Sequence, residues 1–221
     1  MSADVTSLVS AVSELAHTAR AVCAPPAEVL EAVSTLIKQA QAALHNYTWP
    51  GPYAVEQLAP PGNGTLRWDP SDLRATVPYS PILGHLNPVA GASRIWCEDG
   101  QVRGVVTLGP VHAGPIGAAH GGVVAAVLDE IASLAVLACG GVGYTQTLTV
   151  NYRRRTPLHE PLELWAHTAG LSAGVYLTAA EVRHDGAVTA SAIGVHRAAG
   201  LRSDAVYPRS STWASSESSC G

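Results

Sequence analysis

One apolar stretch, from Ala118 to Gly140, constrains the fold more than any other part of the chain. Its large apolar residues recur at spacings of three and four, which places them on one face of a helix. The opposite face carries small residues and one acid, Asp129. We therefore predict a helix that packs against other elements on both sides. Because burying an unpaired charge is costly, Asp129 should either have a pairing partner or take part in function. The alternative is an Asp129 that faces water. The large apolar residues are Val124, Val127, Leu128, Ile131 and Leu134.

The start of this predicted helix favours binding of a negatively charged oxygen. His120 precedes Gly121 and Gly122 and the apolar run follows them. The first N–H groups of a helix lack internal partners, and the helix dipole adds partial positive charge there. Glycine lets another molecule approach the backbone closely. The site therefore suits a carbonyl oxygen that gains negative charge during attack. Glu130 is the competing acid, but it points about 100° away from Asp129, toward the apolar face.

The spacing of these residues resembles a known family. His-Gly-Gly followed by Asp129, nine residues after His120, is similar to the motif of the hotdog-fold acyl-CoA thioesterases of the PaaI-like (phenylacetate-type) branch. The resemblance covers roughly residues 80 to 198. In one departure, Gly114 stands where some relatives have Asn. Three further segments fit the branch: GPIG at 114–117, Asn87-Pro88, and LTVNYRRRTPL at 148–158.

The resemblance implies roles for several residues. Asp129 would act as general base or nucleophile, and the Gly122 N–H, with Gly121 nearby, would polarise the thioester carbonyl. His120 would hold the loop and hydrogen-bond the thioester oxygen. Thr145 stands where the family places a hydroxyl that positions water or the acid. The predicted substrate-binding residues are Gly114, Thr145, Arg153, Arg154 and Arg155.

The three arginines are expected to reach the phosphates of coenzyme A, since guanidinium groups suit phosphate. The alternative is a solvated strand end. Coenzyme A is part of the substrate, so no cofactor is expected, and the histidines show no metal-ligand spacing. The family is built from homodimers, often paired into homotetramers, so we expect sites shared between subunits.

One alternative function remains open, and two other enzyme classes are not favoured. The alternative to the enzyme is a non-catalytic hotdog protein that binds acyl-CoA as a sensor, although such proteins lose the acid or the His-Gly-Gly. A hotdog hydratase is not favoured because its Asp–His pair is missing. A serine hydrolase is not favoured because the chain has no G-x-S-x-G motif.

The order of predicted elements gives an α+β hotdog fold, an antiparallel sheet wrapped around one long helix. Residues 1–48 form an N-terminal helical hairpin, 49–80 a loop-rich linker with one short strand at 73–77, 81–198 the hotdog domain, and 199–221 a disordered tail. Residues 92–98 and 102–108 form a hairpin around Asp99-Gly100. The strands after the helix are 145–152, 162–169, 175–184 and 187–197. His112 is expected to be an exposed loop residue.

Composition limits the class of protein and its partners. The chain is 47% hydrophobic, which is enough for a sizeable core, and its net charge of −4 argues against a nucleic-acid surface. The four cysteines show no paired spacing, so we expect free thiols in a reducing compartment. The first ten residues lack the basic region of a signal peptide, and no uninterrupted apolar stretch approaches membrane-spanning length. We therefore expect a cytoplasmic protein that does not bind membranes.

Overall fold

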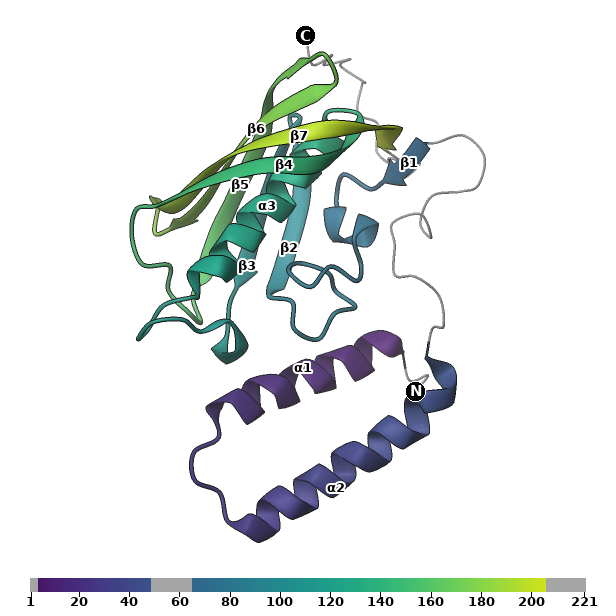
Figure 1. Ribbon diagram of the computed structural model, residues 1–221, viewed down its shortest axis with the longest axis vertical. Coiled ribbons are helices and arrows are strands. Elements are labelled where there is room, and N and C mark those ends of the chain that lie inside the picture. The colour runs from purple at the N-terminus through teal and green to yellow at the C-terminus, as the bar shows by residue number, and fades with distance from the viewer. Residues whose placement is uncertain (1–3, 49–64, 206–221) are drawn as a thin grey trace.

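The computed structural model describes residues 4–48 and 65–205 of the chain, and they form an α+β domain preceded by two helices (Figure 1). The central helix α3 (Gly121–Ala138) packs against five strands of one sheet, β3 to β7. Its apolar face is fully buried, with Leu128 and Ile131 both at 0% exposure. The predicted hotdog architecture, a sheet around one long helix, is confirmed.

The sheet has seven strands in the order β1-β7-β6-β5-β3-β2, and β4 also pairs with β7. All pairings are antiparallel except the short parallel contact of β1 with β7. Within the described residues β4 pairs only with β7, so its other edge is open. The strands are β1 (Thr65–Trp68), β2 (Ala92–Glu98), β3 (Gln101–Thr107), β4 (Gly141–Tyr152), β5 (Pro161–Ser172), β6 (Val175–His184) and β7 (Ala187–Ala205).

Tight turns set the register of the hairpins. Asp99-Gly100 joins β2 to β3, and Asp185-Gly186 joins β6 to β7. Both residues of each turn have positive φ, a conformation that glycine adopts at no steric cost and that matches the twist of the flanking strands. The predicted bounds of β2 and β6 are confirmed, and those of β3, β4 and β5 differ from the structure by one to four residues.

The N-terminal hairpin consists of α1 (Val5–Ala21) and α2 (Ala27–Leu44), followed by a short 3-10 helix η1 (His45–Tyr47). The two helices run antiparallel, and α1 lies between α2 and the domain (Figure 1). Neither helix buries a residue. The contact of α1 with the domain is made at η4 (Pro110–His112), where the rings of His17 and His112 lie 5.6 Å apart.

The structure corrects the predicted linker and tail. Residues 65–80 belong to the core, since Trp68 and Leu73 are buried. The segment predicted as a strand at 73–77 is instead a 3-10 helix, η3 (Leu73–Thr76), whose N-cap Asp72 accepts a hydrogen bond from Arg74 N–H. Residues 199–205 are not tail, because β7 continues through them to pair with β1. The remainder of both segments, 49–64 and 206–221, lies outside the described residues.

One expectation from composition also fails. Cys23 and Cys97 are free thiols as expected, but Cys139 is disulfide-bonded, a pairing that spacing along the chain cannot reveal. Cys220 lies outside the described residues. By length and composition α3 is apolar enough to cross a membrane, although Asp129 and Glu130 interrupt its apolar sequence. Its packing against the sheet accounts for that apolarity, because a helix buried on most sides is apolar on most sides.

We expect the stability of the domain to depend on α3 and not on the hairpin. Ile131→Ala should lower the free energy of unfolding by about 2–5 kcal/mol, because it leaves a cavity at a fully buried position. Leu30→Ala, at a position 51% exposed on α2, should change it by less than about 0.5 kcal/mol. Denaturant unfolding of both variants provides the measurement, and equal losses would contradict this division.

Candidate active site

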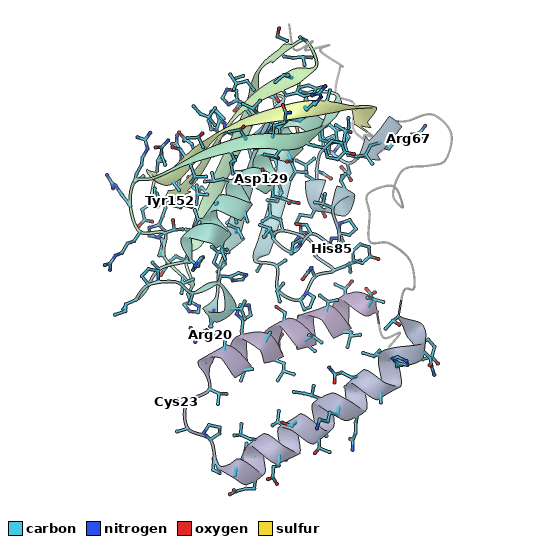
Figure 2. The ribbon with its side chains drawn as sticks, in the orientation of Figure 1. Arg20, Cys23, Arg67, His85, Asp129 and Tyr152 are labelled. Atoms are coloured by element: carbon cyan, nitrogen blue, oxygen red, sulfur yellow. The ribbon has the colours of Figure 1, made fainter. Side chains whose placement is uncertain are left out.

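The first turn of α3 begins at Gly121, and His120 is its N-cap. The Gly122 N–H donates a hydrogen bond to Nδ1 of His120 at 3.0 Å. The Gly121 N–H takes part in no hydrogen bond among the described residues. The Tyr152 hydroxyl, at the end of β4, donates to the Gly121 carbonyl at 2.8 Å (Figure 2). The hydrogen bond from Tyr152 of β4 therefore holds the start of α3 in place. Among the described residues the Gly121 N–H remains unpaired.

Gly114 lies directly behind this helix start. A Cβ at Gly114 would lie 2.6 Å from the Cα of His120, closer than real Cβ contacts allow. The chain therefore needs glycine here, and the Asn of some relatives does not fit this backbone. No side chain is available at Gly114, so any contribution to substrate binding comes from its backbone.

His112 is a buried residue, and the expectation of an exposed loop histidine is wrong. Its Nδ1 accepts a hydrogen bond from Gly109 N–H at 3.0 Å, and its Nε2 lies 2.9 Å from the Val89 carbonyl. The His112 carbonyl accepts from the His120 N–H at 2.8 Å. His112 therefore ties the loop before α3 to the domain.

Asp129 and Thr145 are brought together on the partly exposed side of α3. The Thr145 hydroxyl donates to Oδ1 of Asp129 at 2.8 Å. Thr145 faces the helix because of a β-bulge, a register shift between Thr145 and Thr147 in the pairing of β4 with β7. Downstream of the bulge the core-facing residues are Leu148 and Val150, which have even numbers, so strict alternation would turn Thr145 away.

His196, which the sequence does not single out, adjoins this pair. His196 is on β7, fully buried, and its Nδ1 lies 3.2 Å from the Thr145 hydroxyl. On its other side Nε2 lies 2.9 Å from the hydroxyl of Thr178 on β6. Burial lowers the pKa of His196, and the negative charge of Asp129 partly opposes this. The only signal in the sequence was a histidine within a predicted strand, which does not indicate a partner.

Glu130, the competing acid, is set apart from Asp129. It is partly buried, and desolvation raises its pKa. A hydrogen bond with the Ser80 side chain acts in the opposite direction, and the negative charge of Asp129 raises the pKa further. Glu130 therefore interacts with Ser80, whereas Asp129 accepts a hydrogen bond from Thr145.

The three arginines follow the end of β4 in the chain. Arg153, Arg154 and Arg155 have exposed side chains, and no ion pair of the described residues involves them. The backbone N–H groups of Arg153 and Arg154 both donate to the Thr189 carbonyl. Because Tyr152 reaches Gly121, this basic segment starts beside the first turn of α3.

The predicted site residues thus fall into two groups along α3. His120, Gly121, Gly122 and the arginines gather at its N-terminus, whereas Asp129 and Thr145 lie further along. Eight residues separate Gly121 from Asp129, which is about 12 Å along a helix axis. Within one chain the two groups do not meet at a single point.

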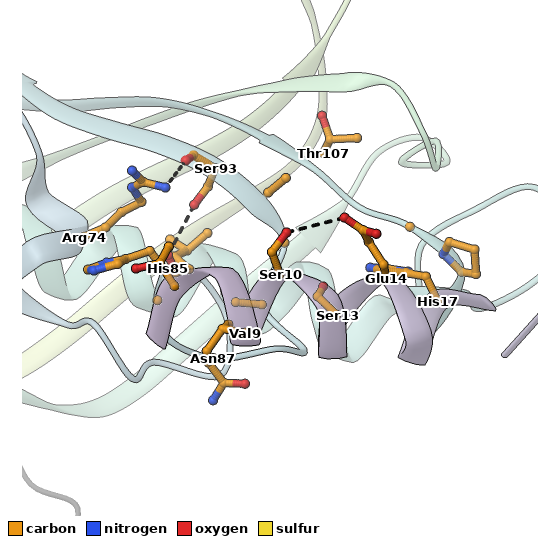
Figure 3. Close-up of a pocket in the computed structure, with 18 of the residues that line it drawn as sticks. Val9, Ser10, Ser13, Glu14, His17, Arg74, His85, Asn87, Ser93 and Thr107 are labelled. Carbon is orange, nitrogen blue, oxygen red and sulfur yellow. Dashed lines mark hydrogen bonds between the residues drawn. The ribbon is translucent and has the colours of Figure 1, made fainter. Parts of the chain in front are cut away.

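A cavity of about 530 Å³ lies elsewhere, between α1 and the loop around residues 83–93 (Figure 3). Ser10, Ser13 and His17 of α1 face it, and Arg74 and Ser93 line the domain side. It does not include His120, Asp129 or Thr145. Among the residues that the structure describes, no group of three His, Cys, Asp or Glu side chains is arranged to hold a metal ion.

The raised pKa of Glu130 gives a prediction about stability. The folded protein binds this proton more tightly than the unfolded chain, so the free energy of unfolding falls as pH rises from the ordinary pKa of 4.5 through the folded value. Glu130→Gln should therefore be more stable than wild type at pH 8, and the difference should shrink at pH 5. Thermal unfolding at both pH values tests this, with the exposed Glu28→Gln as control. A Glu130→Gln protein destabilised equally at both would contradict it.

Comparison with known proteins finds a family match for part of the chain. The family model described as Thioesterase superfamily matches residues 116–191, from the loop before α3 into β7. A crystal structure described as a thioesterase superfamily protein is 26% identical, covers 89% of this chain and 92% of its own, and has a TM-score of 0.74. No curated protein matches the chain closely enough to count as a relative.

Two further solved structures are similar to about half of this chain. A hypothetical thioesterase with coenzyme A from Streptococcus pneumoniae TIGR4 is 21% identical over 50% of this chain and 91% of its own, with a TM-score of 0.48. The PaaI protein of the E. coli phenylacetic acid degradation operon is 15% identical over 51% of this chain and 83% of its own, with a TM-score of 0.47. The resemblance seen in the sequence is therefore supported by these matches: residues 116–191, within the hotdog domain, match the thioesterase superfamily model.

Proposed function

We propose that this protein hydrolyses an acyl-CoA thioester to the free acid and coenzyme A, with Asp129 as general base or nucleophile. The observation that carries the proposal is the hydrogen bond from Thr145 to Oδ1 of Asp129 on the partly exposed side of α3. It holds a carboxylate at a surface where a substrate has access, in a domain of the thioesterase superfamily. The second oxygen, Oδ2, has no hydrogen bond among the described residues and is available to a water molecule.

The first turn of α3 supports the other half of the reaction, stabilisation of the oxyanion. The unpaired Gly121 N–H and the helix dipole favour a developing negative charge. The Gly122 N–H donates to His120 in the absence of substrate. In the proposed mechanism the thioester oxygen takes the place of Nδ1 on the Gly122 N–H, and the released imidazole hydrogen-bonds the thioester.

The arginines support coenzyme A as the carrier of the acyl group. Arg153, Arg154 and Arg155 are exposed, without ion-pair partners in the described part of the chain, and start beside the α3 N-terminus. Guanidinium groups bind phosphate through paired hydrogen bonds. The phosphates of coenzyme A would neutralise this local positive charge in a protein whose net charge is −4. The reaction needs no cofactor, and a cytoplasmic location remains a prediction.

We further propose that each site is shared by two copies of the chain. A catalytic base acts within about 3 Å of its proton, directly or through one water, whereas Asp129 lies about 12 Å along α3 from Gly121. A second copy related by a two-fold axis would bring its Asp129 to the first copy's Gly122. The open edge of β4 supports this arrangement, because an unpaired antiparallel edge is able to pair with its own copy. Two-fold symmetry then gives two equal sites.

A non-catalytic acyl-CoA-binding protein is the second candidate, and one observation favours it. The Gly122 N–H, a proposed oxyanion donor, is already satisfied by His120. A protein of this kind would bind acyl-CoA without releasing free thiol. A panel of acyl-CoA thioesters, followed by both thiol release and calorimetric binding, separates the two functions.

Asp129→Asn should lower kcat by about a hundredfold or more, because loss of a positioned base typically costs a factor of 10² to 10⁴. Glu130→Gln should cost far less, since Glu130 interacts with Ser80 and not with Thr145. Turnover of the best acyl-CoA of the panel gives the measurement, with thermal unfolding as control for the fold. Unchanged turnover by Asp129→Asn would rule out this mechanism, and equal losses would mean that the acid is misassigned.

Mixed dimers test the shared site. Gly122→Pro removes the Gly122 N–H at a helix position where proline is tolerated, and loss of an oxyanion donor typically costs a factor of 10² to 10³ in rate. Inactive Asp129→Asn and Gly122→Pro chains, co-expressed with different tags, should form heterodimers with one intact site and regain part of the activity. Purified heterodimers without activity, or a fully active monomer, would exclude sharing.

A further inference from the structure

The buried side chain of His196 has a place in the fold that packing alone does not explain. It lies on β7 between Thr145 of β4 and Thr178 of β6, and both ring nitrogens face a hydroxyl. A Cβ at Gly194 would lie 2.6 Å from Nε2 of His196 and 2.6 Å from the Thr178 hydroxyl oxygen. Only glycine at this position leaves room for the contact between His196 and Thr178.

The direction of each hydrogen bond follows from counting protons. The single hydroxyl proton of Thr145 goes to Oδ1 of Asp129, so the Thr145 oxygen is an acceptor toward His196. The Nδ1 of His196 must then carry a proton. In the neutral ring Nε2 is left as an acceptor, and the Thr178 hydroxyl donates to it. The chain of donors runs from Thr178 through His196 and Thr145 to Asp129.

Burial favours the neutral ring that this chain requires. His196 has no exposed surface, and desolvation lowers its pKa, although the charge of Asp129 opposes the effect. The second possible acceptor for Thr178 is the Gly194 carbonyl, at 3.4 Å. The Nε2 contact, at 2.9 Å, is the shorter of the two, so Thr178 holds the tautomer with its proton on Nδ1.

We infer that His196 is a positioning residue for the proposed hydrolysis: its Nδ1–H turns the Thr145 hydroxyl proton toward Asp129 and so orients the carboxylate. The inference rests on the proposed role of Asp129 as base or nucleophile. A Thr145 hydroxyl without this donor is free to rotate and to point its proton elsewhere. Asp129 then loses the hydrogen bond that fixes the plane of its carboxylate. Oδ2 is no longer held in a single orientation toward the thioester carbon.

A pair of substitutions separates positioning from packing. Asn places an amide nitrogen one bond from Cγ, where Nδ1 of His196 lies, whereas Gln extends its amide toward the position of Nε2. His196→Asn should keep kcat within about threefold of wild type. His196→Gln should lower kcat about tenfold with KM within about twofold. In a Thr145→Val background His196→Gln should add no further loss, because the residue acts through Thr145.

A spectroscopic measurement tests the inference without turnover. Nitrogen chemical shifts of the His196 ring at pH 7 should show the neutral tautomer with its proton on Nδ1, and Thr145→Val or Thr178→Val should reduce its population. Thr189→Val is the control, because it removes a buried hydroxyl of β7 that does not contact His196. It should leave both the tautomer and kcat unchanged. A proton on Nε2, a charged ring in the wild type, or equal losses in His196→Asn and His196→Gln would overturn the inference.

The two kinds of failure are distinguishable. If Asp129→Asn retains activity, the proposed mechanism is wrong, while the tautomer still reports whether His196 orients Thr145. If Asp129→Asn is inactive and His196→Gln has the wild-type kcat, the mechanism stands and the positioning role is wrong.

Discussion

The packing of α3 against the sheet is the interaction on which the rest of the structure depends. Five strands contact this helix and bury residues such as Leu128 and Ile131 completely. One strip, which carries Asp129, stays partly exposed beside the open edge of β4. The same packing holds the helix start, because Tyr152 at the end of β4 reaches the Gly121 carbonyl. Burial of α3 therefore positions both groups of candidate site residues.

Local sequence patterns predicted most helices and strands of this domain. The features that they did not predict depend on residues far apart in the chain. Periodicity and turn dipeptides identify α3, β2 and β6, since those signals lie within each segment. The parallel contact of β1 with β7 joins residues more than a hundred positions apart, and nothing in either segment indicates it.

The sequence named most residues of the candidate site, but it did not predict the hydrogen bonds between them. His-Gly-Gly and Asp129 have a characteristic spacing, so they were found in the sequence. Thr145 was named from the family alone, and its contact with Asp129 depends on a bulge that alternation cannot predict. His196 had no local signal, because its partners lie on two other strands. His112 was expected to be an exposed loop residue. The fold instead buries it, and its hydrogen bonds hold the loop before α3 against the domain.

The order of elements along the chain has a consequence for synthesis. α3 ends at Ala138, and four of the five strands that contact it follow later, the last ending at Ala205. At roughly 5–20 residues per second, about 3 to 13 seconds pass on the ribosome before the last strand is complete. During that interval an apolar helix of membrane-spanning length lacks most of its cover. A chain truncated before β7 would leave α3 partly uncovered, however stable its other elements are.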